Sequence, residues 1–138
     1  MIYSIDVRIE APVRDTEVTD RVLDAVHNVF PNAECRETPG TLVGETHTLE
    51  PFSDVLHEQS ILDTARREFL KHADSEGFSF SLKKQAAFEG VVNFAVGNPD
   101  ELGEITVSVR VREPDVESII DAVAPPTEDG TPIDPETV

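Results

Sequence analysis

Five basic side chains fall within one short stretch of an otherwise acidic chain, and they have the chemistry needed to contact phosphate groups. The chain has 138 residues and a formal net charge of −17. Residues 60–90 are neutral overall, so the rest of the chain carries the whole negative charge. Guanidinium and ammonium groups neutralise and orient nucleic-acid backbones, which makes this stretch the first candidate for a binding site. Its basic residues are Arg66, Arg67, Lys71, Lys83 and Lys84, and Gln85 follows them as a polar neighbour.

Three of these cations belong to a predicted helix. At 100° per residue, Arg67 and Lys71 point away from the apolar face and Arg66 flanks its boundary. One interpretation is an ordinary solvated surface, on which Asp63 and Arg67 form a pair four residues apart. The other is a shared basic surface, formed if the strand that ends before the two consecutive lysines runs back beside this helix. The apolar face consists of Ile61, Leu62, Ala65 and Phe69.

Other kinds of site find little support. The Gly-x-x-x-Gly run that ends at Gly44 is followed by glutamate, not by the lysine of a phosphate-binding loop. His57 and the next glutamate begin like a zinc-protease helix, but isoleucine stands where the second histidine is needed. The single cysteine, Cys35, cannot form an internal disulfide and is expected to be a small buried hydrophobe. We therefore expect no metal, no cofactor and no catalytic residue. A hydrolase site assembled from distant segments is the enzymatic alternative.

The periodicities predict an α+β fold, a mostly antiparallel sheet with helices packed on one face. Alternating apolar and polar residues predict strands at 3–10, 33–38, 41–48, 78–82, 91–95 and 105–111. Apolar residues three and four apart predict one helix capped by Asp15 and Thr16, a long helical stretch over 50–72, and a short helix after Pro114. A turn is expected at residues 97–100.

Residues 1–124 are expected to form a single domain, and residues 125–138 an acidic, proline-rich tail without packing. Acidic residues are spread along the whole chain, which suggests adaptation to a salt-rich cytoplasm, where a surface dense in carboxylates stays hydrated. No apolar run approaches the ~20 residues of a membrane span, and the first residues alternate as a strand does. We therefore expect a halophilic, cytoplasmic protein with no membrane contact.

Three blocks of the sequence resemble a small archaeal family of uncharacterised proteins for which RNA binding has been proposed. The blocks are residues 42–45, residues 59–67 with the run Ile-Leu-Asp-Thr-Ala-Arg, and residues 82–94 with the run Lys-Gln-Ala-Ala-Phe. The resemblance spans most of the chain as far as about Arg112, and the acidity is that of a haloarchaeal member. It implies a fold similar to that of the ribosomal protein that holds 5S ribosomal RNA, no enzymatic activity, and a proposed link to the archaeal RNA-degrading exosome.

The resemblance also implies which residues contact RNA. The family's basic positions fall on Arg66, Arg67 and Lys84, with Gln85 and Asn93 as polar neighbours. Two positions depart from the family's pattern. The departing residues are Lys83, where asparagine is common, and Ser60, where a base is frequent.

Two functions remain in view. The first is RNA binding without chemistry, in a ribosomal or RNA-processing context. High salt weakens phosphate contacts, so stacking would have to contribute, and Phe88 is either the stacking residue or a core residue between strands. The alternative is a protein-interaction or dimerisation module, in which strand 105–111 or the last helix docks a second copy or an exosome-related or ribosome-related protein.

Overall fold

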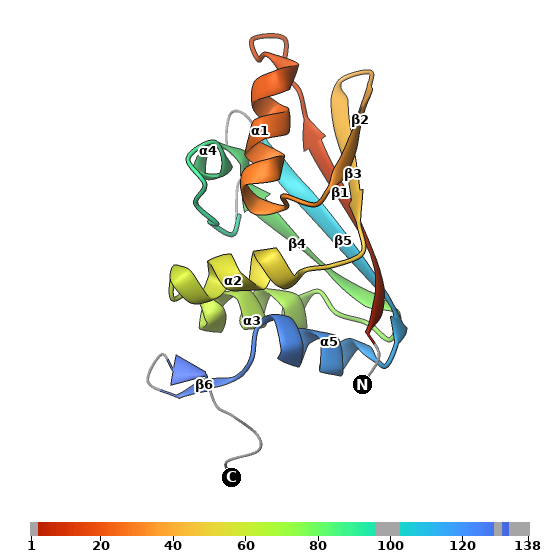
Figure 1. Cartoon of the computed structure of the whole chain (residues 1–138), viewed down its shortest axis with the longest axis vertical. Coiled ribbons are helices and arrows are strands. Elements are labelled where there is room, and N and C mark those ends of the chain that lie inside the picture. The colour runs from red at the N-terminus through yellow and green to blue at the C-terminus, as the bar shows by residue number, and fades with distance from the viewer. Residues whose placement is uncertain (1–2, 96–102, 129–130, 133–138) are drawn as a thin grey trace.

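The computed structural model describes residues 3–95, 103–128 and 131–132 and confirms the α+β class. A five-stranded antiparallel sheet has the strand order β2-β3-β1-β5-β4, and the helices lie on one side of it (Figure 1). The strands of this sheet are β1 (Ser4–Pro12), β2 (Glu34–Thr38), β3 (Thr41–Thr46), β4 (Gly77–Lys83) and β5 (Glu104–Glu113). The helices are α1 (Thr19–Val29), α2 (Glu50–Glu58), α3 (Leu62–Lys71), α4 (Lys84–Ala87) and α5 (Val116–Val123).

The central strand β1 shows why the two faces of the sheet differ. Its apolar residues alternate with polar ones, and every apolar side chain from Ile5 to Ala11 is buried on the side of the helices. The register puts Val7 opposite Thr46 of β3 and Val109 of β5, so buried positions align across the sheet. Because side chains alternate, most polar residues of the five strands project from the other face; Thr46 and Glu37 are exceptions, since their register partners Val7 and Leu42 are buried on the side of the helices.

Aromatic rings join the helices to the sheet. Phe52 of α2 stacks on Phe30 at 5.1 Å and on Phe80 of β4 at 5.2 Å between ring centroids. Phe69 of α3 packs against Phe78 and Phe80 at 4.9 and 4.8 Å. Burial of these rings stabilises the packing of the helices on the sheet.

The expected helix over residues 50–72 is interrupted, and this prediction was wrong. α2 ends at Glu58, and Ser60 adopts a left-handed backbone conformation with φ of 56°. The amide of Ile61 then donates to the carbonyl of Leu56 at 3.1 Å, which completes a helix-ending motif of the Schellman type. The chain turns here, so α2 and α3 bury separate apolar faces.

Other boundaries also differ from the predictions. α1 begins at Thr19 instead of being capped by Asp15 and Thr16, because the preceding residues form a turn held by Glu17, whose carboxylate accepts from the amide of Arg14. Residues 91–95 form one isolated bridge, Leu82 to Phe94, instead of a strand. The short last helix is confirmed, with Asp115 as its cap: Oδ1 accepts from the amide of Ser118 at 2.7 Å.

The expected tail is described only in part. Two-residue strands β6 (Thr127–Glu128) and β7 (Thr131–Pro132) pair with each other. Residues 129–130 and 133–138, and the turn expected at 97–100, lie outside the described residues, so the division at residue 124 stays a prediction. Within the described ranges, no helix has both the length and the apolarity to cross a membrane.

Candidate nucleic-acid interface

Lys84 lies inside the protein, so the expectation that it contributes to a basic surface was wrong. Its side chain is fully buried, and Nζ donates to the carbonyl of Pro12 and, at 2.7 Å, to Oε1 of Glu17. The cause is strand alternation: Lys83 projects from the side without helices, so the next residue turns toward the helices. This ion pair ties α4 to the loop between β1 and α1.

Arg66 also has a structural partner. Its guanidinium donates to Oδ1 of Asp121 at 2.7 Å and to the carbonyl of Ala124 at 3.2 Å, and 24% of the side chain is exposed. These bonds join α3 to the end of α5. The expectation that this cation points outward as part of a phosphate-binding surface is therefore not met by its geometry.

The remaining predicted residues do not share one surface. Arg67 and Lys71 are exposed on α3, and within the described ranges neither forms a salt bridge. Gln85 is exposed on α4. Lys83 pairs in register with Glu104 and projects from the opposite side of the sheet. Phe88 is partly buried and packs against the core, as the non-stacking interpretation expects.

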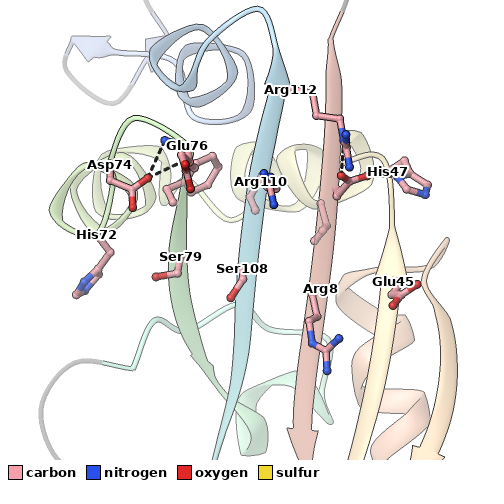
Figure 2. A pocket seen from close by; sticks show the side chains of 15 residues that line it. Arg8, Glu45, His47, His72, Asp74, Glu76, Ser79, Ser108, Arg110 and Arg112 are labelled. Carbon is pink, nitrogen blue, oxygen red and sulfur yellow. Dashed lines mark hydrogen bonds and ion pairs between the residues drawn. The ribbon is translucent and has the colours of Figure 1, made fainter.

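The face of the sheet opposite the helices, here called the open face, gathers a different set of cations (Figure 2). Strand register places five of the chain's eleven basic residues there, next to five acidic ones. These ten charges balance, in a chain of charge −17, and three further carboxylates lie beside them: Asp74 and Glu76 line the groove of this face, and Glu113 lies opposite Ser4. The basic residues are Arg8, Arg36, Lys83, Arg110 and Arg112, and the acidic ones are Asp6, Glu10, Glu34, Glu45 and Glu104.

A shallow groove of about 600 Å³ runs over the open face. Arg8, Arg110 and Arg112 line it. Arg8 Nε donates to Glu10 at 2.9 Å and Arg112 Nε donates to Asp6 at 2.6 Å, with more than half of each arginine side chain exposed. Arg110 forms no salt bridge with any described residue. Each guanidinium therefore keeps donors available toward solvent, since arginine has five.

Asp6 links two of the groups around the groove. It accepts from Arg112, and its Oδ1 lies 3.1 Å from Nδ1 of His47. The hydrogen bond from the Arg112 guanidinium lowers the pKa of the Asp6 carboxyl below its ordinary value. The carboxylate therefore stays ionised and holds the guanidinium in place.

Sequence reasoning missed the open face because its cations are scattered. Arg8 and Arg110 are a hundred residues apart but become diagonal neighbours, since Arg8 lies opposite Ser108. The signal in the sequence that could have indicated this face is the presence of basic residues at the polar positions of predicted strands. The register that joins these strands was not available from one sequence.

Among the described residues, Cys35 is one candidate nucleophile. Its Sγ lies 3.9 Å from Nε2 of His27, which is also 2.9 Å from the carbonyl of Ala33. Burial raises the pKa of the Cys35 thiol, whereas a nucleophilic cysteine needs a lowered one. Among the residues with described positions, no three His, Cys, Asp or Glu side chains gather as a metal ion requires. The contact between Cys35 and His27 is therefore a packing contact and not a catalytic pair.

Comparisons with known proteins place the chain in a family. The model of the RNA_binding family, described as RNA binding, matches residues 6–112. A UPF0201 protein of Methanopyrus kandleri is 40% identical over 136 residues, covering 88% of this chain and 85% of that protein. A UPF0200/UPF0201 protein of Archaeoglobus fulgidus is 34% identical over 131 residues, covering 94% of this chain but 40% of that protein. The chain thus spans less than half the length of this second relative.

A crystal structure agrees with these matches. The UPF0201 protein from Methanococcus jannaschii superposes with a TM-score of 0.87 at 36% identity, covering 94% of this chain and 99% of the other. The archaeal family expected from the sequence blocks is confirmed at this level. The chain belongs to the family described as RNA binding and, by its relatives, to the archaeal UPF0201 proteins.

Proposed function

We propose that this protein binds RNA without chemical catalysis and that the open face is the binding surface. One observation carries the proposal: the open face gathers five of the eleven basic residues of a chain of charge −17, within a domain that matches a family described as RNA binding. Phosphates are repelled least where the carboxylates are balanced. A ribosomal or RNA-degrading context, and a salt-rich cytoplasm as the setting, belong to the same proposal.

Ion pairs on the open face support this role. Arg8 and Arg112 are each held by one neighbouring carboxylate and keep other N–H groups exposed. A guanidinium held in this way loses less conformational entropy when it meets a phosphate. Arg110 lies between them on the same groove and supplies a third contact.

The cations on α3, which the sequence predicts as RNA contacts, offer the competing surface. Arg67 and Lys71 are exposed, so a phosphate can reach both. A matched pair of double variants separates the two surfaces, because each removes two positive charges. The sheet variant is Arg8→Gln/Arg110→Gln, and the helix variant is Arg67→Gln/Lys71→Gln.

We expect the sheet variant to reduce RNA affinity in potassium chloride by roughly tenfold or more, because two phosphate contacts are lost. The helix variant is expected to bind as the unchanged protein does. Filter binding at several salt concentrations measures this. The proposal fails if no RNA is retained, or if the sheet variant binds as the unchanged protein does, whatever the result for the helix variant.

We propose a protein partner as a second candidate function, which one observation favours. In Archaeoglobus fulgidus the matching relative is named a UPF0200/UPF0201 protein, and most of it lies outside the match. Covalent linkage raises the effective concentration of two parts that act together. The partner would then be a UPF0200 protein on a separate chain. Co-purification of the two proteins in molar salt tests this, and their elution as separate species removes it. Light scattering on the same samples tests for a homodimer.

A further inference from the structure

The centre of the open face carries hydroxyl groups instead of charges. Ser79 of β4 lies directly opposite Ser108 of β5, and Ser81 lies opposite Thr106 one pair further along (Figure 2 shows the first pair). Ser108 in turn lies opposite Arg8 of β1. Within the described part of the chain, none of these four hydroxyls has a side-chain hydrogen bond, and Thr106 and Ser108 are exposed while Ser79 and Ser81 are partly exposed.

The floor of the groove is also low beside these hydroxyls. Gly77 faces Arg110 in register, and a side chain there would place its Cβ 1.9 Å from the carbonyl oxygen of Val109. Only glycine fits this close approach of the strands. Long arginine side chains therefore stand beside a low strip of glycine and serine residues. The difference in height between them forms the shallow groove.

The open face has no aromatic side chain at any described strand position. The phenylalanines of β4, Phe78 and Phe80, are buried on the side of the helices, and Val43 is the aliphatic exception on the open face. Proteins that hold unpaired nucleotides stack their bases on aromatic rings. At its described strand positions this surface lacks phenylalanine, tyrosine and tryptophan, and the aromatic rings exposed along its groove are the imidazoles of His47 and His72.

Carboxylates limit where phosphates can lie. Asp6, Glu45, Asp74 and Glu76 line the groove together with the arginines. A phosphate is therefore favoured next to a guanidinium and disfavoured elsewhere, while the uncharged hydroxyl strip suits a neutral part of the ligand such as the ribose.

We infer that the open face binds the shallow minor groove of an A-form RNA duplex, with the hydroxyls of Ser79 and Ser108 bonded to ribose 2′-hydroxyls and Arg8 and Arg110 bonded to phosphates. A-form duplexes present a wide, shallow minor groove lined by 2′-hydroxyls, which side chains on a sheet can reach. The inference rests on the proposed function. It also predicts binding that weakens little as salt rises, because hydrogen bonds between neutral hydroxyls release no counterions.

The test compares three probes with one set of proteins in molar potassium chloride. The probes are an RNA duplex of about 16 base pairs, a DNA duplex of the same sequence and one RNA strand alone. The proteins are the unchanged chain, Ser79→Ala/Ser108→Ala, the sheet variant Arg8→Gln/Arg110→Gln, and a control, Thr64→Ala/Ser118→Ala, whose hydroxyls lie on α3 and α5. Circular dichroism confirms that each variant is folded.

We expect the unchanged protein to bind the RNA duplex about tenfold more tightly than either other probe. The serine variant is expected to lose most of the preference for RNA over DNA, whereas the control keeps it. The sheet variant is expected to bind both duplexes more weakly and to keep their ratio.

The inference is overturned if the single strand or the DNA duplex binds as tightly as the RNA duplex, or if the serine variant keeps the ratio. These outcomes leave the proposed function standing as long as the sheet variant still weakens RNA binding. If no probe binds, or if the sheet variant binds normally, the proposed function fails as well.

Discussion

Lys84 follows strand β4 and Arg110 lies in the neighbouring strand β5, yet these two cations lie in opposite environments. Lys84, just beyond the end of β4, is fully buried and bonded to Glu17 and Pro12. Arg110, within β5, is exposed on the open face and forms no salt bridge with a described residue. The difference teaches that the side of the sheet on which a cation falls decides its role. Its closeness in sequence to other cations does not.

The largest expected effect is on stability, at the buried cation. Lys84→Met leaves the carboxylate of Glu17 buried without its partner, and Oε2 of that residue already has no hydrogen bond among the described groups. We expect the free energy of unfolding to fall by about 3–5 kcal/mol. Urea denaturation in potassium chloride measures this.

Two further variants sharpen the result. Lys83→Met, next in sequence but on the open face, is expected to change stability by less than about 0.5 kcal/mol. Glu17→Leu/Lys84→Met removes both charges and should recover most of the loss. If Lys84→Met and Lys83→Met both lower the free energy of unfolding by the same small amount, the buried ion pair does not stabilise the fold more than a surface lysine does.

Arg66 is the intermediate case, because it is partly exposed but bonded. Arg66→Gln removes the bonds to Asp121 and to the carbonyl of Ala124. We expect a loss of about 1 kcal/mol in the free energy of unfolding, reduced by solvent screening, and no change in RNA affinity. Arg67→Gln serves as the control with no stability effect. If Arg66→Gln weakens RNA binding at unchanged stability, Arg66 belongs to the interface after all.

Arg110 should behave in the reverse way. Arg110→Gln is expected to leave stability within about 0.5 kcal/mol and to lower the magnitude of the slope of log K against log salt by about 1, because one phosphate contact is lost. RNA titrations at four or more salt concentrations give the slope. An unchanged slope would remove Arg110 from the set of phosphate contacts.

The smallest expected effect concerns the titration of Asp6. The Arg112 guanidinium lowers its pKa, so the pair stabilises the fold above about pH 4, the range of an unfolded aspartate, and this contribution is lost as pH falls through the lowered folded pKa. Carboxyl NMR is expected to show the pKa of Asp6 rising toward its ordinary value in Arg112→Gln. The same pKa in both proteins would contradict the role assigned to Arg112.

The sequence was sufficient for most strands and their buried residues, and insufficient for strand pairing, for residues 91–95 and for the surface. Alternation identified β1, β4 and β5, since one buried face imposes a period of two. The break at Ser60 was missed because it depends on one left-handed residue. The open face was missed because strand pairing, a long-range property, brings Arg8 beside Arg110. Lys84 was misassigned because the charge count carries no information about burial.

The most direct test of the central claim is an NMR titration of the labelled protein with an RNA duplex in potassium chloride. We predict that the amide signals that shift belong to β1, β4 and β5 around Arg8, Ser79 and Ser108, while those of α3 around Arg67 stay in place. Shifts confined to α3 and α4 would contradict the account and return the binding site to the helical side of the sheet.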